Sequence, residues 1–155
     1  MIHTYHAEIR WDGSSNETTS SYTSYTRNHT IRIIDKPDLL GSADPHFRGD
    51  PSRYNPEELF LSSIASCHML WYLHLCADNN IKVTSYEDQP IGEMKTEDDG
   101  SGSFSSVELR PHTIITKDAD LDLAYALHDK AHSLCFIANS CNFLIHCTPD
   151  IVRLP

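Results

Sequence analysis

Two cysteines occupy positions where a thiol can act chemically. Cys67 lies inside a long, mostly apolar stretch, and Cys135 lies in a second apolar row nearer the C-terminus. A free cysteine packs well as a small hydrophobic residue, so each is by itself consistent with an inert buried thiol. A peroxide-reducing thiol needs a low pKa, a second thiol within reach, and charged partners that stabilise the thiolate. The residues alone leave both interpretations open.

The compartment decides how the five cysteines are interpreted. Residues 1–13 lack the basic segment followed by an apolar one that marks a secretory signal. No apolar run approaches the roughly 20 residues of a membrane span. We therefore expect a cytoplasmic protein, in which ordinary thiols stay reduced. An odd number of cysteines there predicts inert thiols, a metal site or redox chemistry, and we interpret Cys76, Cys141 and Cys147 as structural.

The charge of the chain excludes some partners. A formal charge of −10 repels nucleic acid and anionic membrane surfaces, so we expect neither as a partner. Apolar residues make up 39% of the 155 residues, which is low enough that part of the core is expected at a subunit interface.

Histidines offer a rival chemistry. His128, His132 and Cys135 fall on one face of an expected helix, and the neighbours Cys67 and His68 are further candidate ligands. Cysteine and histidine suit zinc, so a zinc protein is one alternative function. Packed or solvent-facing histidines explain the same pattern. Because no tight pair of ligands stands out, we expect no metal and no other cofactor.

The expected elements indicate an α+β protein with one domain over residues 1–155. Strands are expected within residues 3–11 and 20–34, and a proline- and glycine-rich loop over 36–54. Asn55 and Pro56 then begin a helix that runs to about Asn79 and is apolar on most sides, as a buried central helix is.

The second half of the chain continues this pattern. Residues 81–96 and 104–116 flank an acidic, glycine-bearing tip and predict a long antiparallel hairpin. A second helix follows Asp118 or Asp120 and carries an apolar row that reaches Cys135 and Ala138. A short strand near residues 142–147 closes the chain.

Two cysteine motifs resemble those of the OsmC/Ohr family. Residues 55–60, N-P-E-E-L-F, followed by S-C-H at 66–68, are similar to the family's first cysteine motif, including the spacing of ten residues from glutamate to cysteine. Residues 131–135, A-H-S-L-C, are similar to the motif of its second cysteine. The resemblance covers about residues 25–147.

The resemblance implies a fold, an assembly and roles for residues. It implies an OsmC-like fold: an intertwined homodimer whose two central helices are wrapped by antiparallel β-sheets, with active sites at the subunit interface. It implies a thiol peroxidase that reduces organic hydroperoxides to alcohols, with Cys67 as the peroxidatic cysteine and Cys135 as the resolving cysteine. Glu57 matches the glutamate that holds a catalytic arginine, and Arg27 is our first choice for that arginine. Three other arginines compete for the role: Arg10, Arg48 and Arg53.

Substrate and partners follow from the same resemblance. The apolar neighbours Phe60, Leu70 and Trp71 favour an organic peroxide over hydrogen peroxide, although the same side chains suit a core. A cellular dithiol, a lipoyl protein or a thioredoxin-like protein, is expected to reduce the disulfide. Residues 136–140, F-I-A-N-S, depart from the Ohr branch and indicate an OsmC-like subgroup. A non-enzymatic protein that binds a small apolar ligand is the other alternative.

Overall fold

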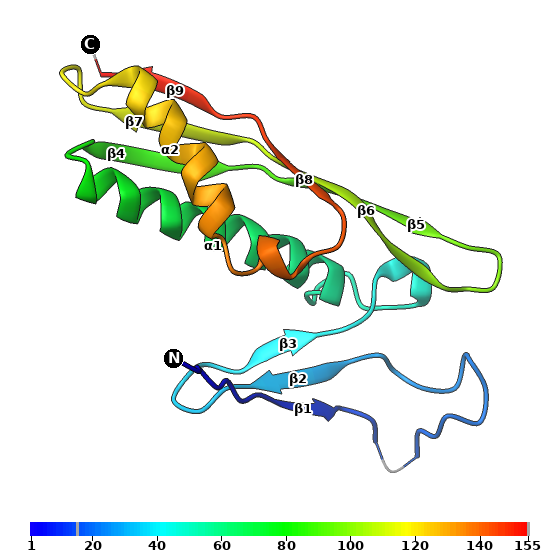
Figure 1. Ribbon diagram of the computed structural model, residues 1–155. Coiled ribbons are helices and arrows are strands. Elements are labelled where there is room, and N and C mark those ends of the chain that lie inside the picture. The colour runs from blue at the N-terminus through cyan, green and yellow to red at the C-terminus, as the bar shows by residue number, and fades with distance from the viewer. Residues whose placement is uncertain (15, 155) are drawn as a thin grey trace. The chain divides into compact units, whose positions relative to one another are not determined.

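The computed structural model describes residues 1–14 and 16–154. The chain divides into two compact units, one over residues 1–60 and a second that begins at Leu61 and takes in the rest. Figure 1 shows the helices and strands of both units.

The first unit contains a small antiparallel sheet. Its strands are β1 (Glu8–Trp11), β2 (His29–Arg32) and β3 (Leu39–Gly41), paired in that order. A 3-10 turn, η1 (Pro45–Phe47), follows, so the expected loop over 36–54 contains short regular elements.

The strand expected over residues 20–34 is wrong in its first part. The Ser24 hydroxyl donates to the Thr18 and Ser21 carbonyls at 2.5 and 2.9 Å, and these bonds hold the segment in turns. Serine and threonine side chains that bond to local backbone compete with sheet formation. The threonine- and tyrosine-rich composition therefore predicted more strand than forms.

The long helix α1 (Pro56–Asp78) begins and ends as the sequence predicts. Asn55 Oδ1 accepts from the Glu58 amide at 2.8 Å, and Glu58 Oε2 accepts from the Asn55 amide at 3.1 Å. This reciprocal capping box satisfies two backbone donors at the start of the helix. Asn80, in the left-handed conformation at φ 59°, follows its end.

The second unit has two mixed sheets instead of one continuous hairpin. Its six strands are β4 (Val83–Asp88), β5 (Ile91–Thr96), β6 (Gly102–Leu109), β7 (Pro111–Ile115), β8 (Leu144–Cys147) and β9 (Asp150–Arg153). The pairs β4–β7 and β5–β6 are antiparallel, while β8 joins β6 and β9 joins β7 in parallel.

The predicted hairpin is interrupted in both of its arms. Pro90 separates β4 from β5, and Arg110 separates β6 from β7. A proline interrupts a strand because it lacks the amide donor. The last strand, β9, was not predicted from the sequence.

The second helix, α2 (Leu121–Leu134), is capped by Asp120, whose carboxylate accepts from the Leu123 amide at 3.0 Å. It ends one residue before Cys135, so the predicted helical row through Cys135 and Ala138 is too long. The chain turns there into a 3-10 turn, η2 (Ala138–Ser140).

The core of the second unit lies between its two helices and the sheet β4–β7–β9. It takes side chains from α1, α2, β7 and β9, which places both helices on the same sheet. Its largest contributors are Tyr72, Ile115, Leu127 and Ile151.

Candidate active site

The two cysteines of the sequence motifs are neighbours in the second unit. Cys67 comes from the middle of α1 and is half-buried, and Cys135 follows the last residue of α2 and is fully buried. Both thiols are free, and the Cys67 side chain is close enough to Cys135 to act on it through a hydrogen bond and through charge. The structure therefore brings together the two thiols that the redox interpretation requires.

The surroundings of Cys135 keep it a neutral thiol. Burial first, and the neighbouring Cys67 second, raise its pKa to about 11. The backbone amide of Ala138 donates to the Cys135 sulfur at 3.4 Å and opposes this shift. Cys135 is thus protonated at neutral pH, sheltered from solvent, and held beside the more exposed Cys67.

Arg27 and Glu57 line one cavity of the first unit. The cavity measures about 410 Å³ and is also lined by Trp11, Tyr25 and Phe47. The Arg27 guanidinium donates to the Tyr25 carbonyl at 2.6 Å, and it lies 4.0 Å from the centre of the Tyr25 ring. Within residues 1–14 and 16–154, no ion pair joins Arg27 to Glu57.

The other candidate arginines have different surroundings. Arg53 bonds to the Asp12 carboxylate at 2.9 Å, which ties it to the strand-bearing part of the first unit. Arg10 and Arg48 are exposed, and Arg48 adopts a left-handed backbone at φ 66°.

Glu57 and Cys67 lie on the same helix but far apart along it. Ten residues of α-helix rise about 15 Å, which is farther than a glutamate side chain reaches.

The predicted substrate residues differ in exposure. Phe60 and Trp71 are half-buried, whereas Leu70 is 63% exposed. The Trp71 ring meets the exposed ring of Phe136 edge to face, with centroids 5.5 Å apart.

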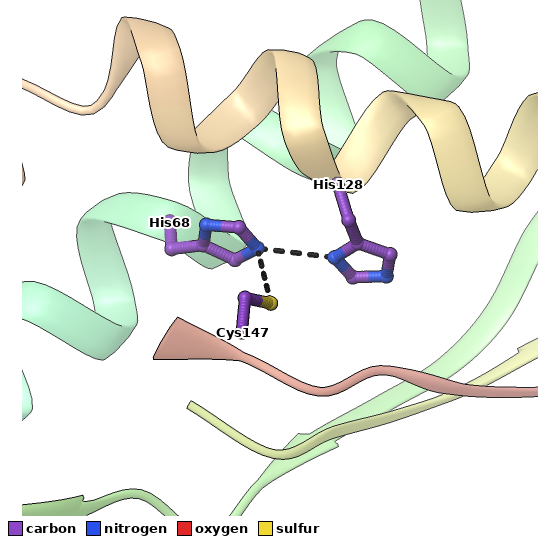
Figure 2. A group of neighbouring side chains, drawn as sticks. All are labelled: His68, His128 and Cys147. Carbon is purple, nitrogen blue, oxygen red and sulfur yellow. Dashed lines mark hydrogen bonds between the residues drawn. The ribbon is translucent and has the colours of Figure 1, made fainter. Parts of the chain in front are cut away.

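A second group of potentially reactive side chains lies in the same unit. Two buried histidines, His68 of α1 and His128 of α2, meet Cys147 at the end of β8 (Figure 2). His68 Nε2 and His128 Nδ1 are 3.0 Å apart, and Cys147 Sγ lies 3.6 Å from His68 Nε2. The sequence pointed to both histidines but missed Cys147, because pairing with β6 sets the end of β8 and no local motif marks it.

Comparison with known proteins places this geometry in a family. A family model described as OsmC-like protein matches residues 49–148. An OsmC-like protein of unknown function from Vibrio cholerae is 30% identical, with a TM-score of 0.86 over 96% of this chain and 100% of that one. The chain belongs to the OsmC-like family.

Two further solved structures show the same OsmC-like fold at lower identity. An organic hydroperoxide resistance protein OsmC from Legionella pneumophila is 17% identical, with a TM-score of 0.67 over 97% of this chain and 98% of that one. The organic hydroperoxide resistance protein OhrB of Bacillus subtilis is 20% identical, with a TM-score of 0.61 over 96% and 98%. Among curated proteins, none matches the chain.

The buried histidines of this OsmC-like chain predict an acid-sensitive fold. Burial is the main cause that lowers the pKa of His68 to about 4 and that of His128 to about 3, against an ordinary value of 6.5. As the pH falls, these histidines bind protons in the unfolded chain at a higher pH than in the folded chain. Their contribution to the free energy of unfolding is therefore complete above about pH 6.5 and is lost as the pH falls toward 4. At pH 5 each histidine is expected to lower the free energy of unfolding by about 2 kcal/mol relative to pH 7.5.

Denaturant unfolding at a series of pH values tests this expectation. The variant His128→Gln should flatten the decline, whereas His74→Gln, which alters an exposed histidine of α1, should keep it. Equal free energies of unfolding at pH 5 and pH 7.5 in the parent protein would contradict the assignment.

Proposed function

We propose that this protein is a thiol peroxidase that reduces organic hydroperoxides to alcohols. The observation that carries the proposal is the pair of free, neighbouring thiols, Cys67 and Cys135, in a chain of the OsmC-like family. Solved organic hydroperoxide resistance proteins with the same fold support a role in peroxide resistance.

The reaction has two steps that balance without a cofactor. The Cys67 thiolate attacks the peroxide oxygen that carries hydrogen, the O–O bond breaks, and Cys67 becomes a sulfenic acid. The departing alkoxide takes a proton from solvent, which balances the proton that the Cys67 thiol lost, and leaves as the alcohol. The Cys135 sulfur then attacks the Cys67 sulfur, and the sulfenic hydroxyl leaves as water with the Cys135 proton. A dithiol from the cell, a lipoyl protein or a thioredoxin-like protein, reduces the resulting disulfide by exchange.

The apolar surroundings of Cys67 favour an organic peroxide. Leu70 and Trp71 follow Cys67 on α1, and Phe136 follows Cys135, so apolar side chains flank both thiols. Phe136 is 67% exposed and contacts the half-buried ring of Trp71, which leaves apolar surface for the organic group of a substrate. Hydrogen peroxide has no such group and gains nothing from this surface.

Steady-state consumption of peroxide with a dithiol reductant tests the proposal. We expect a higher kcat/KM for cumene hydroperoxide than for hydrogen peroxide. If the protein consumes neither peroxide and forms no disulfide, the alternative of a non-enzymatic binder of small apolar ligands is favoured instead.

A second copy of the chain is expected to complete the assembly. Against our expectation from the sequence, α1 is long and apolar enough to pass for a membrane span by length and composition, and only 22% of its apolar window is buried within one chain. Another copy of α1 would cover this surface, as in the homodimer that the family resemblance implies. We expect light scattering at micromolar concentration, without detergent, to give the mass of a dimer. A folded, active monomer would contradict the expectation.

The arginine that activates Cys67 is proposed to come from this second copy. Glu57 lies about 15 Å before Cys67 on α1, and Arg27 shares a cavity with Glu57 in the first unit. The Arg27 guanidinium of one copy, placed beside Cys67 of the other, would supply the positive charge that favours a thiolate.

The variant Arg27→Ala tests the identity of this arginine. Removing the positive charge should slow the alkylation of Cys67 by iodoacetamide at pH 7. Arg32→Ala is the control, because Arg32 is paired with Asp38 and is not a candidate for this role. If the pH profile of alkylation is unchanged in Arg27→Ala, the role passes to Arg10, Arg48 or Arg53.

A further inference from the structure

Three side chains of the types that bind soft metal ions converge in the second unit, apart from the proposed redox pair. They come from different elements, α1, α2 and β8, and Figure 2 shows that His68, His128 and Cys147 point toward one another. Both histidines are only 1% exposed, and Cys147 is half-buried. The fold therefore places two imidazoles and a thiol around one point in the interior.

The distances suit one shared ion. Zinc bonds of about 2.0–2.1 Å to nitrogen and about 2.3 Å to sulfur, at tetrahedral angles, place neighbouring ligand atoms about 3.3–3.6 Å apart. His68 Nε2 is 3.0 Å from His128 Nδ1 and 3.6 Å from Cys147 Sγ. All three ligand atoms lie within 4.8 Å of one another, so small side-chain rotations bring them to bonding distance.

The electrostatic surroundings also favour a cation. Burial keeps both imidazoles neutral, which is the form that coordinates a metal. Asp88 and Asp129 lie near enough to Cys147 to act on it through their negative charges. The carboxylates that disfavour a bare thiolate attract a positive ion, and the buried Oδ2 of Asp88 has no hydrogen-bond partner.

We propose that His68 Nε2, His128 Nδ1 and Cys147 Sγ bind a zinc(II) ion. Imidazole and thiolate ligands suit zinc, and three protein ligands leave its fourth position to water or a small ligand. The thiolate supplies one negative charge to offset the double positive charge of the ion. This site departs from our expectation of a metal-free protein, and it uses Cys147 in place of the helical row formed by His132 and Cys135.

A zinc ion at this site would link three elements of the second unit. It would join α1, α2 and β8, because His128 and Cys147 lie 60 and 79 residues after His68 in the chain. Metal binding would also release the Cys147 proton, because the thiolate is the ligand.

Zinc titration of the chelator-treated, reduced full-length protein against a competing fluorescent indicator tests the site. We expect one zinc per chain, and an affinity that falls at least about 100-fold in Cys147→Ser, because even outer-shell changes cost about 10–100-fold. Cys141→Ser, which alters a half-buried cysteine outside the cluster, is the matched control and should bind as the parent does.

Two further measurements separate this site from other outcomes. The double variant Cys67→Ser/Cys135→Ser should keep its zinc, which excludes binding by the redox pair. Cobalt(II) added to the parent should give a thiolate-to-cobalt charge-transfer absorption that Cys147→Ser lacks while circular dichroism shows an intact fold. The proposal is wrong if zinc binds substoichiometrically, if only copper(I) binds, or if Cys147→Ser binds zinc as tightly as Cys141→Ser.

Discussion

Replacing Cys67 with serine is expected to reduce the consumption of cumene hydroperoxide to the background rate. Serine is nearly isosteric with cysteine, and Cys67 is half-buried, so the fold should persist. A hydroxyl is a far weaker nucleophile toward peroxide than a thiolate, so the first step of the reaction should stop. Peroxide consumption in the presence of excess dithiol measures this directly.

The control for Cys67→Ser is Cys141→Ser. Cys141 is also half-buried, and its thiol donates to the Ile137 carbonyl at 3.2 Å, outside the proposed reaction. It should turn over peroxide at the parent rate. Comparable turnover by Cys67→Ser and the parent would remove Cys67 from the peroxidatic role.

Replacing Cys135 with serine is expected to allow one oxidation and then stop the reaction. Without a resolving thiol the Cys67 sulfenic acid has no partner for a disulfide, and further peroxide carries it to the sulfinic acid. Serine at this buried position can still accept from the Ala138 amide, so the local turn should hold. Intact-mass spectrometry should show one or two added oxygen atoms.

Peptide mapping should place those oxygen atoms on Cys67. The variant Cys67→Ser treated in the same way should gain none, which excludes oxidation of the remaining cysteines. An unmodified Cys67 in Cys135→Ser, with continued turnover, would mean that Cys135 is not the resolving thiol.

Local signals predicted the parts of the fold that local energies decide. Asn55, Pro56 and Glu58 form the helix start that their side chains favour, and Asp120 caps the second helix. The start of α1 could be predicted because capping depends on a few adjacent residues.

Long-range pairing set the features that the sequence did not show. The predicted hairpin forms two pairs because the break at Pro90 coincides with one at Arg110 on the opposite arm. The strand β9 was missed because its partner, β7, lies well before it in the chain. Apolar alternation identifies a strand but not its partner.

In the candidate site, too, local motifs identified some residues, and long-range packing determined the others. The motifs around Cys67 and Cys135 pointed to both thiols, and the structure makes them neighbours. Arg27 and Glu57 share a cavity because the fold of the first unit brings two distant segments together. Cys147 had no local signal, because its meeting with His68 and His128 depends on the packing of two helices on a sheet.

Mapping the disulfide after one equivalent of cumene hydroperoxide tests whether Cys67 and Cys135 act together as a redox pair. The reduced protein is treated, free thiols are blocked, and the peptides are analysed by mass spectrometry without reduction. We expect one bridge per chain, between Cys67 and Cys135, with Cys76, Cys141 and Cys147 recovered as blocked thiols. Recovery of Cys67 and Cys135 as blocked thiols, with the peroxide unconsumed, would contradict this expectation.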